Sequence, residues 1–339
     1  MLLQEHISLK PFNTFGIDAE ARYYLQVASL QTLRDFSVQS SFRTLPQLVL
    51  GGGSNILLLN DFKGVVLHMA ISGIDKVKED PNYIWIRAGA GVNWHQLVLY
   101  CIAHNYAGIE NLSLIPGTVG AAPIQNIGAY GVELQDVFES LEALEIRTGK
   151  VHTFNSAACA FGYRNSIFKR EQKGRYIILN VTLRLQKKPS FKTDYGAIPQ
   201  TLAVMGIQEL SIKAISDAVI QIRQSKLPDP AQLGNAGSFF KNPVITEAQF
   251  KQLQTHHPQM PGYPQPEGQV KVPAAWLIEQ CGWKEKTAGA VGVHKQQPLV
   301  LVNYGNGTGQ AIYQLAQDIQ QSVQTQFAIK IEPEVNLIA

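Results

Sequence analysis

The sequence has few cysteines, and none of them lies close to another. The three cysteines, Cys101, Cys159 and Cys281, show no CxxC spacing. An odd number of cysteines this far apart indicates neither a disulfide framework nor a zinc site. We expect each to be a small buried apolar side chain. His294 has no partner at metal-ligand spacing, and we expect no metal site.

Long apolar runs and an excess of one charge are also missing. No stretch approaches the ~18 consecutive apolar residues of a membrane helix. The first residues, MLLQEHISLKPF, lack the basic segment and apolar run of a secretion signal. A formal net charge of +3, with Lys and Arg scattered, argues against a nucleic-acid partner. We therefore expect a soluble protein of a reducing cytoplasm that binds neither membrane nor nucleic acid.

The length and the apolar content set the scale of the fold. A chain of 339 residues with 45% hydrophobic residues buries an ample core and predicts two or three domains. Apolar spacing predicts helices at 94–104, 211–224, 274–281 and 310–327, the second with Ser211 as N-cap. Apolar and β-branched runs predict strands at 23–27, 48–50, 65–69, 83–88, 141–147, 176–185, 290–293 and 299–302. The polar connector 186–200 is expected to loop out of the body.

The last residues alternate between apolar and polar side chains. Residues 329–337 place Ile329, Ile331 and Val335 on one side and two glutamates, Glu332 and Glu334, on the other. This period of two predicts one continuous strand, with both carboxylates on its polar face. Such a face is ordinarily just solvated.

Residues 115–131, IPGTVGAAPIQNIGAYG, form the most unusual stretch. It carries no charge and places glycines and two prolines, Pro116 and Pro123, among small residues. Glycine lets a backbone adopt φ > 0 and approach a ligand closely, because no Cβ stands in the way. The stretch therefore predicts a binding loop for a flat or phosphorylated cofactor, with a chain of structural turns as the alternative.

A second glycine turn, GGGSN at 51–55, follows the expected strand 48–50 directly. It is not a P-loop, since no Gly-Lys-Ser/Thr follows, and it lacks the GxGxxG spacing of a dinucleotide fold. Backbone N–H groups of a glycine turn form an anion-binding nest, so a pyrophosphate is a suitable guest. A plain hairpin is the alternative.

Two further motifs gather polar groups among aromatic residues. FGYRNSIFK at 161–169 places Arg164 where its planar fork would stack on a ring or bind a carboxylate. NAGSFFKNP at 235–243 combines the Ser238 hydroxyl with an ammonium and an amide in a turn of small residues. The alternatives are a surface arginine beside a turn and a serine that caps one.

Seven motifs together carry a resemblance. NTFGI at Asn13, GGGSN, IPGTVGAAPIQNIGAYG, FGYRNSIFK, KLPDP at Lys226, NAGSFFKNP and EPEV at Glu332 follow one another along nearly the whole chain. In this order they resemble the UDP-N-acetylenolpyruvoylglucosamine reductase family. Asp194-Tyr195-Gly196 is similar to the tyrosine loop of its longer subclass, which folds over bound substrate.

The resemblance implies an α+β fold in three parts. Two α+β subdomains form an FAD-binding fold of the vanillyl-alcohol-oxidase (PCMH) type, and a third α+β domain binds substrate. The expected ranges are 1–66 with 328–339 for FAD-binding subdomain 1, 67–209 for subdomain 2 with the tyrosine loop near 190–200, and 210–327 for the substrate domain. A monomer is expected.

The resemblance also implies an oxidoreductase with two half-reactions. NADPH, a co-substrate, reduces a non-covalent FAD, and the flavin then reduces UDP-N-acetylglucosamine enolpyruvate to UDP-N-acetylmuramate. This is a step of peptidoglycan synthesis, and so of cell-wall growth, cell shape and division. Arg164 matches the arginine that pairs with the substrate carboxylate, Ser238 the proton donor, and Glu334 the glutamate that assists protonation or holds the enolic carboxyl.

The remaining site residues also follow from the resemblance. Positions that match nucleotide-sugar contacts are Tyr130, Tyr195, Lys226, Asn242 and Gln297. Positions that would hold the flavin and its pyrophosphate are Gly51, Gly52, Gly53, Ser54, Asn55, Pro116, Gly117, Thr118, Gly120, Asn126, Gly128, Ala129 and Gly131. Asn336 stands where relatives often carry arginine, a departure outside the catalytic set.

Two rival readings remain open at this point. An FAD oxidase of the same cofactor fold usually carries a His or Cys for covalent flavin near the first glycine turn, and residues 51–55 contain neither. A non-catalytic flavin or nucleotide-sugar binding protein would keep the glycines but would not require Arg164, Ser238 and Glu334 together. Bleaching of a yellow preparation by NADPH separates an enzyme from a binding protein.

Overall fold

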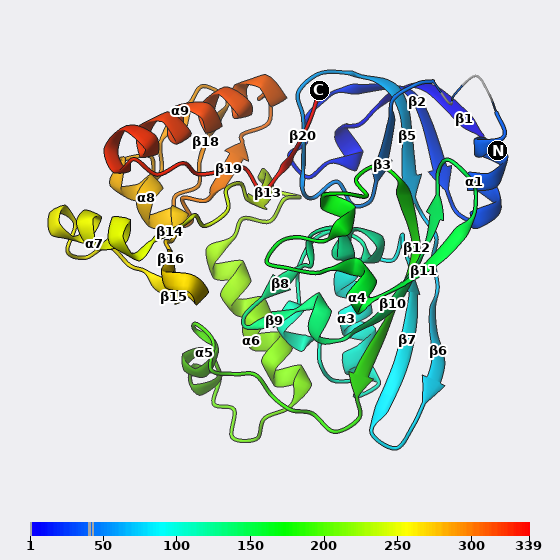
Figure 1. Ribbon diagram of the computed structural model, residues 1–339, viewed down its shortest axis with the longest axis horizontal. Helices are drawn as coiled ribbons and strands as arrows, with labels where there is room; N and C mark the ends of the chain where they lie inside the picture. The colour runs from blue at the N-terminus through cyan, green and yellow to red at the C-terminus, as the bar shows by residue number, and fades with distance from the viewer. Residues whose placement is uncertain (1, 40–41, 43) are drawn as a thin grey trace. The chain divides into compact units, whose positions relative to one another are not determined.

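The computed structural model describes residues 2–39, 42 and 44–339, and the chain forms two compact units (Figure 1). Unit 1 comprises Met1–Ile7, Ala21–Gly52 and Lys63–Ser225. Unit 2 comprises Ser8–Glu20, Gly53–Phe62 and Lys226–Ala339. The chain passes between the units several times, so each is assembled from segments distant in sequence.

Unit 1 contains a four-stranded sheet in the order β1-β2-β5-β3. Its strands are β1 (Leu3–Ser8), β2 (Glu20–Val27), β3 (Gln47–Leu50) and β5 (Phe62–Met69). β3 and β5 run parallel. Helix α1 (Leu30–Ser37) starts where the Ser29 hydroxyl accepts a hydrogen bond from the Thr32 N–H, as an N-cap does.

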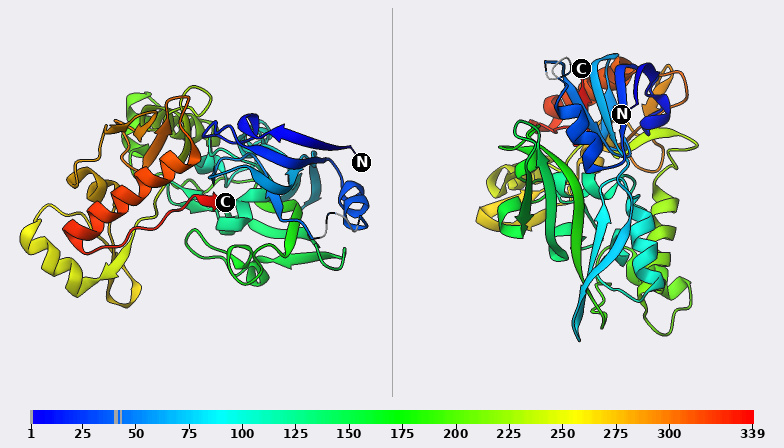
Figure 2. Two further views of the ribbon diagram at one scale, coloured as in Figure 1. Left: turned by 90° about the horizontal axis from the view of Figure 1, so that it is seen from above. Right: turned by 90° about the vertical axis from the view of Figure 1, so that its right-hand side faces the viewer.

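A second sheet of unit 1 has five antiparallel strands in the order β11-β10-β12-β7-β6. They are β6 (Ile74–Glu79), β7 (Tyr83–Gly89), β10 (Phe138–Glu145), β11 (Val151–Asn155) and β12 (Tyr176–Gln186). Figure 2 gives two further views of these strands. Edge strand β6 is mostly exposed and carries several charges, which disfavour pairing with another chain.

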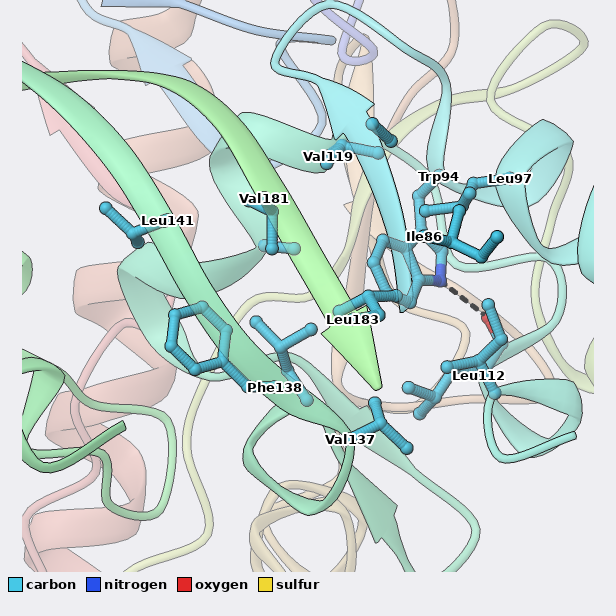
Figure 3. Close-up of a cluster of buried hydrophobic side chains, with 14 of the residues drawn as sticks. Ile86, Trp94, Leu97, Leu112, Val119, Val137, Phe138, Leu141, Val181 and Leu183 are labelled. Atoms are coloured by element: carbon cyan, nitrogen blue, oxygen red, sulfur yellow. Dashed lines mark hydrogen bonds between the residues drawn. The ribbon is translucent and has the colours of Figure 1, made fainter. Parts of the chain in front are cut away.

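Helix α3 (Trp94–Ala103) covers this second sheet. Its expected apolar face, Trp94, Leu97, Val98 and Cys101, is buried. Figure 3 shows Trp94 and Leu97 gathered with side chains of β7, β10 and β12, and the Trp94 indole N–H donates to the Leu112 carbonyl at 3.0 Å. The core between α3 and this sheet is therefore apolar, and the indole N–H of Trp94 within it has a hydrogen-bond partner.

Shorter elements complete unit 1. Helix α6 begins after Ser211, whose Oγ accepts from the Ala214 N–H at 3.1 Å, and it packs with α5 around Ile198, Leu202 and Ile215. The short strands and helices are β8 (Gly128–Ala129), β9 (Val132–Glu133), α4 (Ser156–Cys159), α5 (Ile198–Val204) and α6 (Ile212–Lys226). The 3-10 helices are η2 (Glu110–Leu112), η3 (Val119–Gln125), η4 (Leu134–Asp136) and η5 (Ile167–Lys169).

Unit 2 is built from three small sheets. Their strand orders are β13-β19-β18-β17, β14-β16-β15 and β20-β4. The strands are β4 (Ile56–Leu58), β13 (Gly234–Ser238), β14 (Val244–Thr246), β15 (Tyr263–Gln265), β16 (Gln269–Lys271), β17 (Thr287–Ala288), β18 (Val291–Val293), β19 (Val300–Asn303) and β20 (Asn336–Ile338). The helices are η1 (Lys10–Phe12), α7 (Glu247–His256), η6 (Pro266–Gly268), α8 (Ala274–Gln280) and α9 (Gly309–Phe327).

The long helix α9 (orange to red in Figure 1) buries the face that its spacing predicts. Ile312, Leu315, Ile319 and Val323 are buried. The Thr308 hydroxyl caps its start by accepting from the Ala311 N–H. Among the described residues no helix is both long and apolar enough to cross a membrane.

The chain after α9 differs from the expected continuous strand. Only Asn336–Ile338 is a strand, although Ile329, Ile331 and Val335 are buried as the alternation predicts. Pro333 has no N–H for a ladder and makes only an isolated bridge to Phe240. Side-chain alternation was therefore right about the buried side and wrong about the strand's length.

Most other expected elements are confirmed, with two corrections. Each predicted strand or helix range coincides with one in the structure, and 186–200 contains a loop. That loop is tied down, because the Asn111 side chain donates to the Lys192 carbonyl at 2.8 Å. Cys101 and Cys159 are buried, but Cys281 is half-exposed because it follows the last turn of α8. The three expected domain ranges stay a prediction.

Candidate active site

The two glycine turns of the sequence meet in unit 1. A Cβ on Gly51 would overlap the Thr118 hydroxyl, and one on Gly52 would lie 2.9 Å from the Gly117 Cα. The N–H groups of Val119 and Gly120 donate to the Val92 and Ala90 carbonyls at 2.9 Å, which anchors the glycine-rich segment to the chain before α3. Part of the expected irregular loop is the 3-10 helix η3. Glycine at 51 and 52 is therefore a packing requirement.

This meeting point leaves polar groups without protein partners. Thr118 Oγ1 is buried and makes no hydrogen bond to the described residues. Gly51 is half-buried and Gly52 exposed, and neither backbone N–H donates to a backbone carbonyl in the described part of the chain. The buried Thr118 hydroxyl without a partner is costly, and a ligand with phosphate or carbonyl oxygens would satisfy it together with the glycine N–H groups. The donor set fits the pyrophosphate and ring edge of a flavin nucleotide.

Gly53 belongs to unit 2, where NTFGI holds it. Gly53 has φ +59°, and a Cβ there would overlap the Phe12 carbonyl. The Thr14 N–H donates to the Gly53 carbonyl at 3.1 Å. The Asn13 side chain closes its own turn through Leu9 and Ile17. NTFGI therefore supports the glycine turn.

Arg164 sits in a tight turn of unit 1. Gly162 and Asn165 exchange backbone hydrogen bonds at 3.1 and 3.0 Å around it. Arg164 has φ +51°, a conformation that costs a non-glycine residue about 1–2 kcal/mol. Its Nη2 donates to the Gly128 carbonyl at 2.7 Å, which links the arginine to the glycine-rich segment.

A second arginine, the half-buried Arg223 of α6, lies close to Arg164 and Tyr130. Burial lowers the pKa of Arg223, the positive charge of Arg164 lowers it further, and Tyr130 opposes both effects. The Arg223 Nε is buried with no hydrogen-bond partner in the described part of the chain. Burial also raises the pKa of Tyr130, which has φ +50°. Two neighbouring cations, with the Arg223 Nε donor unused, have the chemistry to attract an anion.

Sequence reasoning missed Arg223. In IRQSK it follows the buried Ile222 on an amphipathic helix, where an arginine ordinarily lies at the edge of the solvated face. No motif marks it. Its proximity to Arg164 depends on the packing of α6 within unit 1, which spacing along the helix does not reveal.

The two expected substrate tyrosines of unit 1 lie together. A Cβ on Gly131, next to Tyr130, would be 3.3 Å from the Tyr195 Cβ. The buried Asn111 amide donates to the carbonyls of Tyr130 and Lys192 at 2.9 and 2.8 Å, and so ties both segments together. The Tyr195 ring itself is 58% exposed. An exposed tyrosine beside Tyr130 is available to cover a ligand.

In unit 2 a β-bulge determines where Ser238 points. Asn235 pairs with Val302 and Ser238 with Val300, so β13 has one residue more than β19 between the two pairs. Gly237 takes the left-handed conformation at φ +66°, and its N–H donates to the Asn235 side chain at 2.9 Å. A bulge of this kind redirects the following side chain. Ser238 is half-buried at the end of β13.

Glu334 lies next to this bulge within unit 2. Its N–H donates to the carbonyl of Phe239, the residue after Ser238, at 2.7 Å. Its carbonyl accepts from the Asn55 amide at 3.4 Å, and Asn55 in turn accepts from the Asn336 N–H at 3.0 Å. The fold thus brings together the hydroxyl segment, the carboxylate segment and the end of GGGSN, which lie far apart in sequence.

Three other expected residues lie in unit 2. Lys226, at the end of α6, is exposed. Asn242 Oδ1 accepts from the Ala274 N–H at 3.0 Å at the start of α8, and Gln297 Oε1 accepts from the Leu299 N–H at 3.5 Å. Arg164, Tyr130 and Tyr195 belong to unit 1, whereas Ser238 and Glu334 belong to unit 2.

Two family models match the chain. One, described as the UDP-N-acetylenolpyruvoylglucosamine reductase C-terminal domain, covers residues 229–338, and one described as an FAD binding domain covers residues 21–155. The UDP-N-acetylenolpyruvoylglucosamine reductase of Amoebophilus asiaticus (strain 5a2) is 62% identical over 338 residues, which is 100% of both chains. The chain belongs to the UDP-N-acetylenolpyruvoylglucosamine reductase family.

Further relatives agree with this membership. The UDP-N-acetylenolpyruvoylglucosamine reductase of Pseudomonas putida is 51% identical over 334 residues, 98% of both chains. The crystal structure of the Thermus caldophilus reductase shares the fold at a TM-score of 0.68, with 22% identity and 100% of both chains covered. The expected α+β fold with an FAD-binding domain is confirmed.

Membership establishes the cofactor as well. This member of the reductase family is an FAD-dependent oxidoreductase. Its FAD-binding match ends at residue 155 and includes Gly51, Gly52 and the whole glycine-rich segment, where Thr118 has its unpartnered hydroxyl. The individual cofactor, substrate and catalytic assignments stay predictions.

Proposed function

We propose that this protein is an NADPH-dependent reductase that converts UDP-N-acetylglucosamine enolpyruvate to UDP-N-acetylmuramate for peptidoglycan synthesis. It acts as a cytoplasmic monomer. The main support is the hydrogen bond from the Glu334 N–H to the Phe239 carbonyl, which places a carboxylate segment beside the bulge that carries Ser238. Membership of the family supports the substrate class.

FAD, when bound, would supply the hydride chemistry that links NADPH to the enolpyruvyl double bond. The electron-rich carbon that develops next to the substrate carboxylate then needs stabilisation and a proton. Arg164 pairs with that carboxylate through its planar fork. A preorganised charge of this kind contributes ~10²–10³-fold in rate.

Ser238 donates the proton in this proposal. A hydroxyl is a weak acid, but the carbon to be protonated is a strong base, so a positioned serine suffices. The bulge at Gly237 determines the direction of its Oγ. Glu334 holds the enolic carboxyl or assists the transfer from the neighbouring segment.

The anionic groups of the substrate match the cations of the site. The substrate carries one carboxylate and one diphosphate, and Arg164 and Arg223 lie together in unit 1 with an unused Nε donor. Lys226 serves as a point charge for a diphosphate. The exposed Tyr195 ring beside Tyr130 covers the bound nucleotide sugar, and Asn242 and Gln297 contribute amide groups.

The test follows the colour of the purified protein under anaerobic conditions. NADPH should bleach its flavin absorbance, and UDP-N-acetylglucosamine enolpyruvate should restore it in stopped-flow traces. A yellow protein that NADPH does not bleach would be a binding protein, and one that bleaches but is not reoxidised by this substrate would be a different reductase. Either outcome contradicts the proposal.

The Ser238→Ala variant separates the two half-reactions. Its flavin should bleach at the wild-type rate, because the hydroxyl has no part in hydride transfer from NADPH, while reoxidation by substrate should slow by a factor of ~10³ or more. Ser322→Ala, which removes a half-buried hydroxyl of α9 in the same unit, should leave both rates unchanged. Near-normal reoxidation of Ser238→Ala would remove Ser238 from the mechanism.

A further inference from the structure

The turn that carries Arg164 is attached to the glycine-rich segment by side chains that the proposed reaction does not use. Arg164 occupies the left-handed region at φ +51°, which a non-glycine residue retains only where its surroundings hold it. The contacts that hold this turn therefore decide where the guanidinium lies.

Asn126 makes the central contact. Its Nδ2 donates to the Gly162 carbonyl at 3.2 Å, at the first residue of the turn, and to the Glu133 carboxylate at 2.8 Å. Its Oδ1 accepts from the Gln135 N–H at 3.0 Å. Asn126 is fully buried, so both donors of its amide are committed inside the protein.

The segment that contains Asn126 also binds the guanidinium of Arg164. Gly128, two residues after Asn126, offers the carbonyl that accepts from Arg164 Nη2 at 2.7 Å. Asn126 itself has φ +45°, which turns the chain between these two contacts. One short segment thus determines both the backbone of the turn and the direction of the guanidinium.

A second set of contacts holds the turn from its other side. Lys169 Nζ donates to the Arg164 carbonyl at 3.4 Å and to Gln125 Oε1 at 3.2 Å. Ser166 Oγ donates to the Ile124 carbonyl at 2.7 Å. Both contacts end on residues that directly precede Asn126, so the turn is tied to this segment at several points.

We propose that Asn126 is a positioning residue that holds Arg164 in place for the substrate carboxylate, and is not a flavin ligand. The proposal rests on the proposed function, because it assigns Arg164 a part in reoxidation of the flavin by substrate. Its physical basis is that both amide donors of Asn126 are bound to Gly162 and Glu133, which leaves none for a cofactor.

The test is a double-mutant cycle of Asn126→Gly and Arg164→Ala, read in both half-reactions. Glycine keeps the left-handed backbone at 126 accessible and removes only the side-chain hydrogen bonds. In the wild-type background, Asn126→Gly should slow reoxidation by substrate ~10²-fold, since a displacement of about 1 Å has this effect. Flavin content and reduction by NADPH should stay within twofold of wild type.

In the Arg164→Ala background, Asn126→Gly should slow reoxidation by less than twofold, because it acts only through Arg164. Equal slowing in both backgrounds, or loss of flavin from Asn126→Gly, would overturn the positioning role. A control is Asn105→Gly, a left-handed asparagine after α3 in the same unit, which should change neither half-reaction.

Two further outcomes keep the two proposals apart. If Arg164→Ala alone leaves reoxidation unchanged, the proposed role of Arg164 fails, and the positioning role fails with it. If Asn126→Gly does not fold, Glu133→Ala removes the acceptor of the Asn126 amide and should slow reoxidation in the same background-dependent way. Unchanged reoxidation in that variant would also overturn the positioning role.

Discussion

Arg223 carries a positive charge into unit 1, where no carboxylate among the described residues pairs with it. Its pKa is lowered chiefly by burial, and its Nε has no partner in the described part of the chain. A partly buried charge without a carboxylate partner destabilises the ligand-free protein and strengthens its attraction for an anion. The residue thus has opposite effects on folding and on binding.

We expect Arg223→Met to raise the free energy of unfolding by about 1 kcal/mol and to raise the KM for the enolpyruvyl substrate at least about 10-fold. Urea unfolding and steady-state kinetics measure the two effects. The control is Arg184→Met, which removes an exposed arginine of β12 that lies over the Tyr83 ring. It should leave KM unchanged. An unstable variant with normal KM would make Arg223 a structural residue only.

The bulge in β13 determines the direction of the Ser238 hydroxyl, the proposed proton donor. Gly237 needs φ +66°, but a Cβ there would meet nothing within 4 Å. Gly237→Ala therefore introduces backbone strain of about 1–2 kcal/mol without a clash. We expect the strand to relieve this strain by loosening the bulge, which would turn the Ser238 hydroxyl away.

Gly237→Ala should accordingly lower Tm by only a few degrees while slowing reoxidation by substrate roughly 10-fold or more. Gly282→Ala is the matched control, because Gly282 after α8 has φ +72° and equally open surroundings. Calorimetry and stopped-flow absorbance compare the two variants. Equal rates in both would mean that the bulge does not direct Ser238.

Regular elements were predictable where their side chains repeat with a clear period. Ile312, Leu315 and Ile319 mark α9 in the sequence, and they are the residues it buries. The segment before β20 has an equally clear alternation but no strand, because its N–H groups find single partners, such as Phe239, far along the chain. Periodicity reports which side is buried, whereas a strand also needs a neighbour, which the periodicity does not reveal.

At the scale of the molecule, the site motifs divide between two units that exchange segments of chain. Gly51 and Gly52 belong to unit 1, whereas Gly53 follows them into unit 2 with NTFGI. Motif residues were predictable because each carries a recognisable residue type. Arg223 and the role of Asn126 were not, because both depend on which segments the fold packs together within unit 1.

The stability of unit 1 depends on two histidines that fold in the neutral form. Nδ1 of His95 accepts from the Leu114 N–H at 3.0 Å, and Nδ1 of His68 is 2.6 Å from the Tyr24 hydroxyl. Burial lowers the pKa of both imidazoles, and Arg223 lowers that of His95 further. The unfolded chain therefore binds protons below about pH 6.5 that the folded chain does not bind.

The contribution of these two histidines to stability is therefore complete above the pKa of the unfolded imidazole. It is lost as the pH falls through the lowered pKa values of the folded protein. We expect the urea midpoint of the ligand-free protein to be lower at pH 5.5 than at pH 7.5, and this difference to shrink in His68→Gln/His95→Gln. The raised pKa of the buried Glu110 carboxyl acts in the opposite direction and is common to both proteins, so it cancels in the comparison. His256→Gln, which removes an exposed histidine of α7, should keep the wild-type pH dependence. If the urea midpoint of the double variant falls as much between pH 7.5 and pH 5.5 as that of the wild type, other groups cause the acid sensitivity.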